Sequence, residues 1–385
     1  MRGITGDSMS GSGVQAGNGR AGDGRTGYGR VADGREASAA RRPRLARALQ
    51  RVGALQLIGR LRAALRHDVR ILAYHRVLES VEPPDFRFDL DLISASSDVF
   101  RQQVDIIKRR CSPMRFDELI DRLDRGQSLP RRAALITFDD GYDDNYRIAW
   151  PILRDAGVSA MFFVSTGHIE SGRPYAYDWL THMVCVTRAD RLQVPELAID
   201  RALPDTLRGR RVIASELLDR IKTLDANAQQ ALIARMQRDW SLPSESGHPD
   251  CRPMTWAQLR EMRDGGMEVG SHGVDHQMLA KMTPVAMREE LVASKSAIER
   301  ALGGEVQVIS YPVGGSDAYD AAVIETVRDA GYRLGCSYRA GPESMRPESR
   351  YDLRRIPVER DVCRDWFEGM LALPEVFCYR SRSRR

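Results

Sequence analysis

Short apolar segments alternate with amphipathic segments along most of this chain, and that alternation limits the possible folds more than any other feature. The segments with strand character are 69–75, 133–141, 158–166, 267–272, 306–312 and 332–338. Segments with helical character lie at 97–110, after Asp117, at 144–156, after Thr255, and at 283–302, 317–330 and 364–372. Strands that alternate with helices indicate an α/β protein with a parallel sheet or barrel, in which catalytic residues gather where strands end.

The sequence divides into five parts. Residues 1–41 form a Gly/Arg-rich tail that is too poor in apolar residues to fold and is predicted to be disordered. Residues 42–67 are predicted to form a basic amphipathic helix, and 68–376 the α/β domain. Inside that domain, 168–253 interrupt the alternation and are predicted to be a helical insertion. Residues 377–385 form a basic tail.

The helix predicted at 42–66 carries both an apolar stripe and several arginines. The apolar positions are Leu45, Leu49, Val52, Leu55, Ile58, Leu61 and Leu65. Two interpretations remain open: the stripe packs on the domain that follows, or it lies on an anionic membrane surface.

Composition excludes several classes of protein. The chain has 385 residues and 58 Lys and Arg against 53 Asp and Glu, a net charge of +5. No stacking aromatics lie within a basic stripe, so no nucleic-acid partner is expected. No apolar run of transmembrane length and no secretory signal pattern is present in the sequence. We therefore expect a cytoplasmic protein, membrane-associated if 42–66 binds lipid.

Two polar clusters follow apolar strands and carry the chemistry. Asp139 and Asp140 end the first, where two carboxylates are costly unless a cation or a proton accompanies them, although Asp-Asp-Gly is also a turn sequence. His272 and His276 form the second, with imidazoles at a spacing that suits zinc, although two surface histidines can have the same spacing. A carboxylate and two imidazoles leave a coordination position open for water, as metal-assisted hydrolysis requires.

The order TFDDG (137–141), SHGVDH (271–276) and YPVG (311–314) resembles the motifs of the polysaccharide deacetylase family, also called the NodB homology domain or carbohydrate esterase family 4. The resemblance runs from about residue 69 to about residue 375. It implies a distorted (β/α) barrel of about seven strands, here with a helical insertion. It also implies removal of acetyl groups from N-acetylated sugars.

The resemblance also assigns roles to residues. Asp139 would be the general base, and Asp140, His272 and His276 would hold a divalent metal, zinc by preference, with cobalt, nickel or manganese as alternatives. The backbone N–H of Tyr311 would donate to the oxyanion and so contact the substrate.

Two departures from the family pattern affect the other half of the site. Many members have an Arg where this chain has Ser310, and a general-acid His late in the chain, whereas no histidine follows His276 here. A permuted branch of the family carries that His on an N-terminal strand, which AYHRV (73–77) resembles. We therefore predict His75 as the general acid, and Arg355 as the residue that orients Asp139, with Arg354 as the rival.

The leading interpretation is a metal-dependent hydrolase of acetamide C–N bonds in an N-acetylated sugar, either polymeric or lipid-linked. The alternatives are an amidohydrolase of a small non-sugar amide and a catalytically inactive carbohydrate-binding protein. Within the insertion, Trp179 could line a substrate groove, although packing in a core is the alternative.

Overall fold

The computed structural model describes residues 41–221, 224, 226–243, 248–315, 317–344 and 349–378. Residues 1–40 of the tail predicted at 1–41 lie outside these residues, and so do 379–385, whereas Arg41 is helical. Phe377 and Cys378 are buried, so the basic tail that we expected from residue 377 begins later than predicted.

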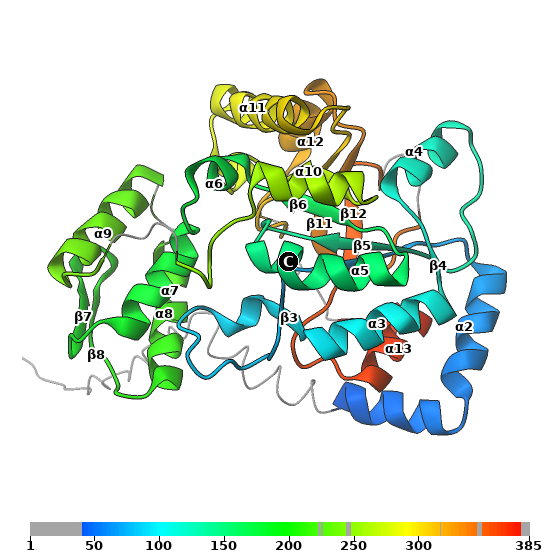
Figure 1. Cartoon of the computed structure of the whole chain (residues 1–385), viewed down its shortest axis with the longest axis horizontal. Coiled ribbons are helices and arrows are strands. Elements are labelled where there is room, and N and C mark those ends of the chain that lie inside the picture. Colours follow the sequence, from blue (N-terminus) through cyan, green and yellow to red (C-terminus); the bar gives the residue numbers. More distant parts are fainter. Residues whose placement is uncertain are drawn as a thin grey trace, which may run out of the picture. The chain divides into compact units, whose positions relative to one another are not determined.

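Seven parallel strands of the described chain close into a barrel (Figure 1). In chain order they are β1 (Arg70–Tyr74), β5 (Ala133–Phe138), β6 (Met161–Val164), β9 (Glu268–Ser271), β10 (Val308–Ser310), β11 (Leu334–Ala340) and β12 (Leu353–Pro357). Each strand pairs with the next, and β1 pairs with both β5 and β12, which closes the ring. Six of these strands were predicted; β12 was missed, because its sequence LRRIP carries two arginines in a five-residue strand.

Helices follow most barrel strands and cover the outside of the barrel. They are α3 (Ser97–Arg110), α4 (Phe116–Asp124), α5 (Trp150–Ala156), α10 (Trp256–Asp264), α11 (Pro284–Leu302), α12 (Ala321–Asp329) and α13 (Arg364–Ala372). The helix starts predicted after Thr255 and at 283 are confirmed and capped: Thr255 and Gln258 form a capping box before α10, and the Thr283 hydroxyl accepts from the Ala286 N–H at the start of α11. These caps fix where each helix begins.

Short elements complete the connections. They are β2 (Arg76–Leu78), β3 (Ile93–Ser96), β4 (Ser112–Pro113), α6 (Thr166–Ser171) and α14 (Pro374–Phe377), the 3-10 turns η1 (Leu90–Leu92) and η4 (Leu279–Lys281), and the π-helical turn η2 (Asn145–Ala149). The strands β2 and β3 pair with each other outside the barrel.

The insertion has a hydrophobic core of its own and lies on one side of the barrel (Figure 1). It comprises α7 (Ala176–Val186), β7 (Arg191–Val194), η3 (Pro195–Leu197), β8 (Ile199–Ala202), α8 (Leu207–Ile221) and α9 (Ala226–Asp239). The helices α7, α8 and α9 confirm the predicted helical insertion, and the antiparallel hairpin of β7 and β8 adds two strands that the sequence did not indicate. The apolar runs of β7 and β8 are too short for the sequence to distinguish a strand from a loop there.

The segment predicted as one basic helix is two helices. Residues 41–51 are helical, Gly53 has a φ of 68°, and α2 (Ala54–Leu65) follows. The helix α2 packs against α13, with Gly59 next to Ala372, and Leu55 and Ala63, four residues to either side of Gly59, are buried, so the packing interpretation holds for that face. Among the described residues, no helix combines the length and apolar character needed to cross a membrane.

Two layers of apolar side chains separate the inside of the barrel from the outside. Alternate residues of a strand point to opposite faces. On β5, Ala134, Ile136 and Phe138 belong to the cluster shared with the outer helices, whereas Leu135 belongs to a second cluster formed mainly by side chains of the other barrel strands. That second cluster fills the barrel interior below the carboxyl ends of the strands.

Candidate functional site

The interior of the barrel becomes polar toward the carboxyl ends of its strands. On β5 the inward positions run from Leu135 to Thr137 and then to Asp139, and on β12 they run from Leu353 to Arg355. Asp139 is 2% exposed and Arg355 is fully buried. The strand period therefore brings a carboxylate and a guanidinium together at the barrel mouth.

Arg355 and Asp139 form a bidentate ion pair. Nη1 and Nη2 of Arg355 each donate to one carboxylate oxygen of Asp139 at 2.7 Å. Nη2 also donates to the Ser310 hydroxyl at 2.9 Å, so this serine contacts the guanidinium directly. Burial favours the neutral carboxyl, but the charge and hydrogen bonds of Arg355 outweigh it and lower the pKa of Asp139. The predicted contact is thus present, and the rival Arg354 is exposed.

Asp140, His272 and His276 converge beside this ion pair. Oδ1 of Asp140 lies 3.3 Å from Nε2 of His272 and 3.4 Å from Nε2 of His276. Tetrahedral zinc, with bonds of about 2 Å, separates its ligand atoms by about 3.3 Å. Oδ1 is buried and has no hydrogen-bond partner in the described chain. The three side chains therefore fit a divalent metal.

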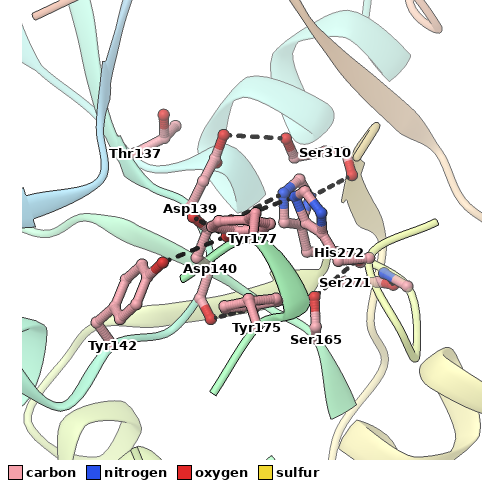
Figure 2. A network of polar contacts seen from close by, with 12 residues as sticks. Thr137, Asp139, Asp140, Tyr142, Ser165, Tyr175, Tyr177, Ser271, His272 and Ser310 are labelled. Atoms are coloured by element: carbon pink, nitrogen blue, oxygen red, sulfur yellow. Dashed lines mark hydrogen bonds and ion pairs between the residues drawn. The ribbon is translucent and has the colours of Figure 1, made fainter. Parts of the chain in front are cut away.

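The two imidazoles differ in the surroundings that would suit them to bind a metal. Nδ1 of His272 lies 2.8 Å from the Ser310 carbonyl oxygen, which requires a proton on Nδ1 and leaves the Nε2 lone pair toward Asp140 (Figure 2). Burial lowers the pKa of His276 to about 3, which keeps its imidazole neutral, the form that binds metals.

Glu290 of α11 holds the loop that carries the histidines, and the sequence did not reveal it. Its Oε1 accepts from the backbone N–H groups of Val274 at 2.7 Å and Asp275 at 3.0 Å. Gly273 has a φ of 80°, and a Cβ there would lie 2.8 Å from that oxygen. Only glycine allows this carboxylate to approach the loop, and His276 follows in a left-handed conformation with φ 54°.

Tyr175 and Tyr177, at the start of α7, are further residues that the sequence did not single out. The Tyr175 hydroxyl donates to the backbone carbonyl of Asp140 at 2.6 Å, and the Tyr177 hydroxyl donates to Oδ2 of Asp140 at 3.1 Å (Figure 2). The available signal was three aromatic residues and an aspartate in the segment YAYDW (175–179).

His75 follows β1 at the same rim. The Asp139 N–H donates to the Tyr74 carbonyl at 2.9 Å, so strand pairing brings His75 next to the carboxylates. Burial alone would raise the pKa of Asp140, but His272, His276 and His75 together lower it. The imidazole of His75 therefore lies within electrostatic reach of the Asp139 and Asp140 carboxylates.

Two expected substrate contacts are wrong. The Tyr311 N–H already donates to the Cys336 carbonyl at 3.0 Å as β10 pairs with β11, and the Tyr311 hydroxyl donates to the Tyr351 carbonyl at 2.7 Å. Its N–H is therefore committed to the sheet and not to an oxyanion. Trp179 is 2% exposed in the insertion core, where its Nε1 donates to Gln237, so the packing alternative holds.

A family model described as polysaccharide deacetylase matches residues 126–194 and 205–335. A Bacillus subtilis protein, YxkH, named as a candidate polysaccharide deacetylase, is 22% identical over 227 residues. That match covers 59% of this chain and 52% of YxkH, so it spans about half the length of this relative.

Two solved structures are similar in fold. The deacetylase PplD of Streptococcus pyogenes, in complex with acetate, is 19% identical with a TM-score of 0.50, over 77% of this chain and 94% of that one. IcaB of Ammonifex degensii is 20% identical with a TM-score of 0.50, over 79% and 96%.

The buried ion pair of Arg355 and Asp139 should contribute to the stability of the fold. In a double-mutant cycle with Arg355→Met and Asp139→Asn, we expect a coupling energy of about 2 kcal/mol or more in urea unfolding, because either single change leaves a buried group without its partner. The matched control is the exposed pair Arg191–Asp200, also 2.7 Å apart, where Arg191→Met and Asp200→Asn should couple by less than about 1 kcal/mol. Equal coupling in the two cycles would contradict the role given to burial.

Proposed function

Because this chain belongs to the polysaccharide deacetylase family, we propose that it is a metal-dependent hydrolase that removes acetyl groups from the N-acetylated sugars of a polysaccharide or glycan precursor. The observation that supports this most directly is the arrangement of Asp139, paired with Arg355, next to the three-residue metal site. One carboxylate faces a guanidinium and the other faces two imidazoles, so the two neighbours are prepared for different tasks.

The roles of the residues follow from their surroundings. A divalent metal, zinc by preference, would be held by Asp140, His272 and His276, and when bound it lowers the pKa of a water and polarises the acyl carbonyl. Asp139 accepts the proton of the attacking water. Arg355 is a positioning residue, because its two hydrogen bonds fix the carboxylate plane of Asp139 and keep that carboxylate ionised.

His75 supplies the proton that the departing amine needs. An amide nitrogen leaves as an amine only if it is protonated as the C–N bond breaks. No histidine follows His276 in the sequence, and His75 lies at the barrel rim beside Asp139. Its backbone is fixed on both sides, since its N–H donates to the Ser94 hydroxyl at 2.9 Å and its carbonyl accepts from Asn145 at 2.8 Å.

A lipid-linked glycan precursor is the substrate form that we favour over the finished polymer. Residues 41–66 contain eight arginines and no acidic residue. On α2, Leu57, Leu61 and Leu65 are 59%, 56% and 82% exposed and lie four residues apart, on a face that α13 does not cover. This stripe of leucines next to arginines fits an anionic membrane surface and would bring the site to a membrane-borne substrate.

Two variants test the metal site and the base. Asp140→Ala should lose bound zinc in elemental analysis, because one of three ligands is gone. Asp139→Asn should keep zinc and yet release acetate from N-acetylated oligosaccharides about 10³-fold more slowly, because the amide cannot accept the proton. Retained zinc in Asp140→Ala would refute the ligand assignment. Release of acetate by the wild type only from small non-sugar amides would contradict the proposed sugar substrate. Binding of glycans without release of acetate would contradict the proposed hydrolase activity.

A second experiment isolates the general acid. His75→Gln should slow acetamide hydrolysis by about 10²-fold or more, yet barely change hydrolysis of 4-nitrophenyl acetate, whose leaving group needs no proton. Asp139→Asn should slow both reactions. His67→Gln is the control, since His67 lies before β1, at the opposite end of the barrel, and contacts the Leu129 carbonyl. Equal losses on both substrates in His75→Gln would rule out the acid role.

Vesicle flotation tests the membrane face. A variant with Leu57→Ser, Leu61→Ser and Leu65→Ser should partition about tenfold less onto vesicles rich in phosphatidylglycerol, because the apolar area that enters the interface is lost. The matched control changes three exposed valines elsewhere, Val212, Val285 and Val292, to Ser. If both variants float like the wild type, the leucine stripe is not the contact.

A further inference from the structure

The metal ligand Asp140 receives two hydrogen bonds from the insertion, which lies outside the barrel. Both donors are tyrosines that come directly before or at the start of α7: Tyr175 reaches the backbone carbonyl of Asp140, and Tyr177 reaches its Oδ2. Tyr175 is buried and Tyr177 is half-buried, and a hydrogen bond to a carboxylate or carbonyl is weakened less by competing water there than at the surface.

The two carboxylate oxygens of Asp140 have separate tasks. Oδ1 faces the two histidines and has no hydrogen-bond partner in the described chain, whereas Oδ2 accepts from Tyr177. A carboxylate that lost this second contact could rotate about its Cβ–Cγ bond and turn Oδ1 away from His272 and His276. Tyr177 thus fixes the orientation in which Oδ1 of Asp140 would bind a metal.

The backbone at Asp140 also needs support. Its φ of 75° is a left-handed conformation, which costs a residue with a side chain of the order of 1 kcal/mol or more. The Tyr175 hydroxyl binds the carbonyl of this same residue at 2.6 Å, so it stabilises the conformation that directs the Asp140 side chain inward. The rings of Tyr175 and Tyr177 stack on each other at 5.0 Å, and both also contact the ring of His276.

A further contact fastens the start of α7 to the loop after β5. Tyr142, two residues after Asp140, donates its hydroxyl to Oδ2 of the fully buried Asp178 at 2.7 Å. The Tyr142 hydroxyl also lies 3.3 Å from that of Tyr177. The rest of α7 packs into the core of the insertion. The insertion therefore determines where both tyrosines stand.

We propose that Tyr175 and Tyr177 are positioning residues of the metal centre, through which the insertion sets the orientation of Asp140 and hence the affinity for the metal. This inference rests on the proposed function, because it takes Asp140 as a metal ligand. It makes the insertion a functional part of the site and not only an addition to one side of the barrel. Groups that orient a ligand typically change metal affinity by 10- to 100-fold when they are removed.

The test measures the zinc affinity of full-length Tyr177→Phe by competition with a chromogenic chelator. We expect at least tenfold weaker binding, since phenylalanine keeps the ring and removes only the hydroxyl. Tyr175→Phe should weaken binding in the same direction. Tyr146→Phe is the matched control, because the Tyr146 hydroxyl also donates to a carboxylate, Glu261, at 2.7 Å, but at the surface. Its zinc affinity should equal that of the wild type.

Thermal unfolding with and without zinc separates positioning from a general loss of stability. Tenfold weaker binding removes about 1.4 kcal/mol of zinc-dependent stabilisation at saturating zinc. If zinc stabilises Tyr177→Phe and Tyr175→Phe as much as it stabilises the wild type, the inference is overturned. If instead Asp140→Ala keeps its zinc, the proposed metal site itself fails, so the two failures are distinguishable.

Discussion

The ion pair between Arg355 and Asp139 joins residues that are 216 positions apart, and neither charge can stay in the barrel interior without the other. A buried carboxylate alone would take up a proton, and a buried guanidinium alone would leave its donors unsatisfied. The pair therefore depends on closure of the barrel, in which β1 bonds to β5 on one side and to β12 on the other. The reactive end of the molecule is built around this pair.

The proposed metal site depends on groups from three different parts of the fold. Asp140 follows β5 and the two histidines follow β9, but Glu290 from an outer helix holds the histidine loop and two tyrosines from the insertion hold Asp140. Left-handed backbone at Asp140 and His276 is tolerated because these hydrogen bonds offset its cost. The strain falls on two of the three residues that we propose as ligands, where orientation would matter most for binding an ion.

The basic segment 41–66 keeps apolar side chains both inside the fold and at its surface. On α2, Leu55 and Ala63 are buried, and Leu57, Leu61 and Leu65 are exposed. The apolar residues of α2 thus lie on more than one face of the helix. A single stripe at three-four spacing would lie on one face, and packing against the domain could bury all of it. Sequence periodicity counts apolar residues but does not say how many partners they will find.

Prediction from the sequence worked best where a local pattern has a local cause. Six of the seven barrel strands and the caps at Thr255 and Thr283 follow from apolar runs and from side chains that bond to nearby backbone. β12 and the hairpin of β7 and β8 were missed, because short strands with charged residues have no distinctive pattern. The prediction for Tyr311 was wrong for a different reason. Whether a backbone N–H is free depends on the neighbouring strand, and here the Cys336 carbonyl of that strand accepts the Tyr311 N–H.

The sequence alone predicted the α/β class, six of the seven barrel strands and the four candidate residues Asp139, Asp140, His272 and His276, because strand ends and ligand types are encoded within a few neighbouring positions. Only the tertiary structure decided what surrounds them. That Arg355 and not Arg354 pairs with Asp139, that Trp179 is core, and that Tyr175 and Tyr177 reach Asp140 are outcomes of strand register, barrel closure and docking of the insertion. These contacts join residues far apart in the chain, so no local pattern specifies them.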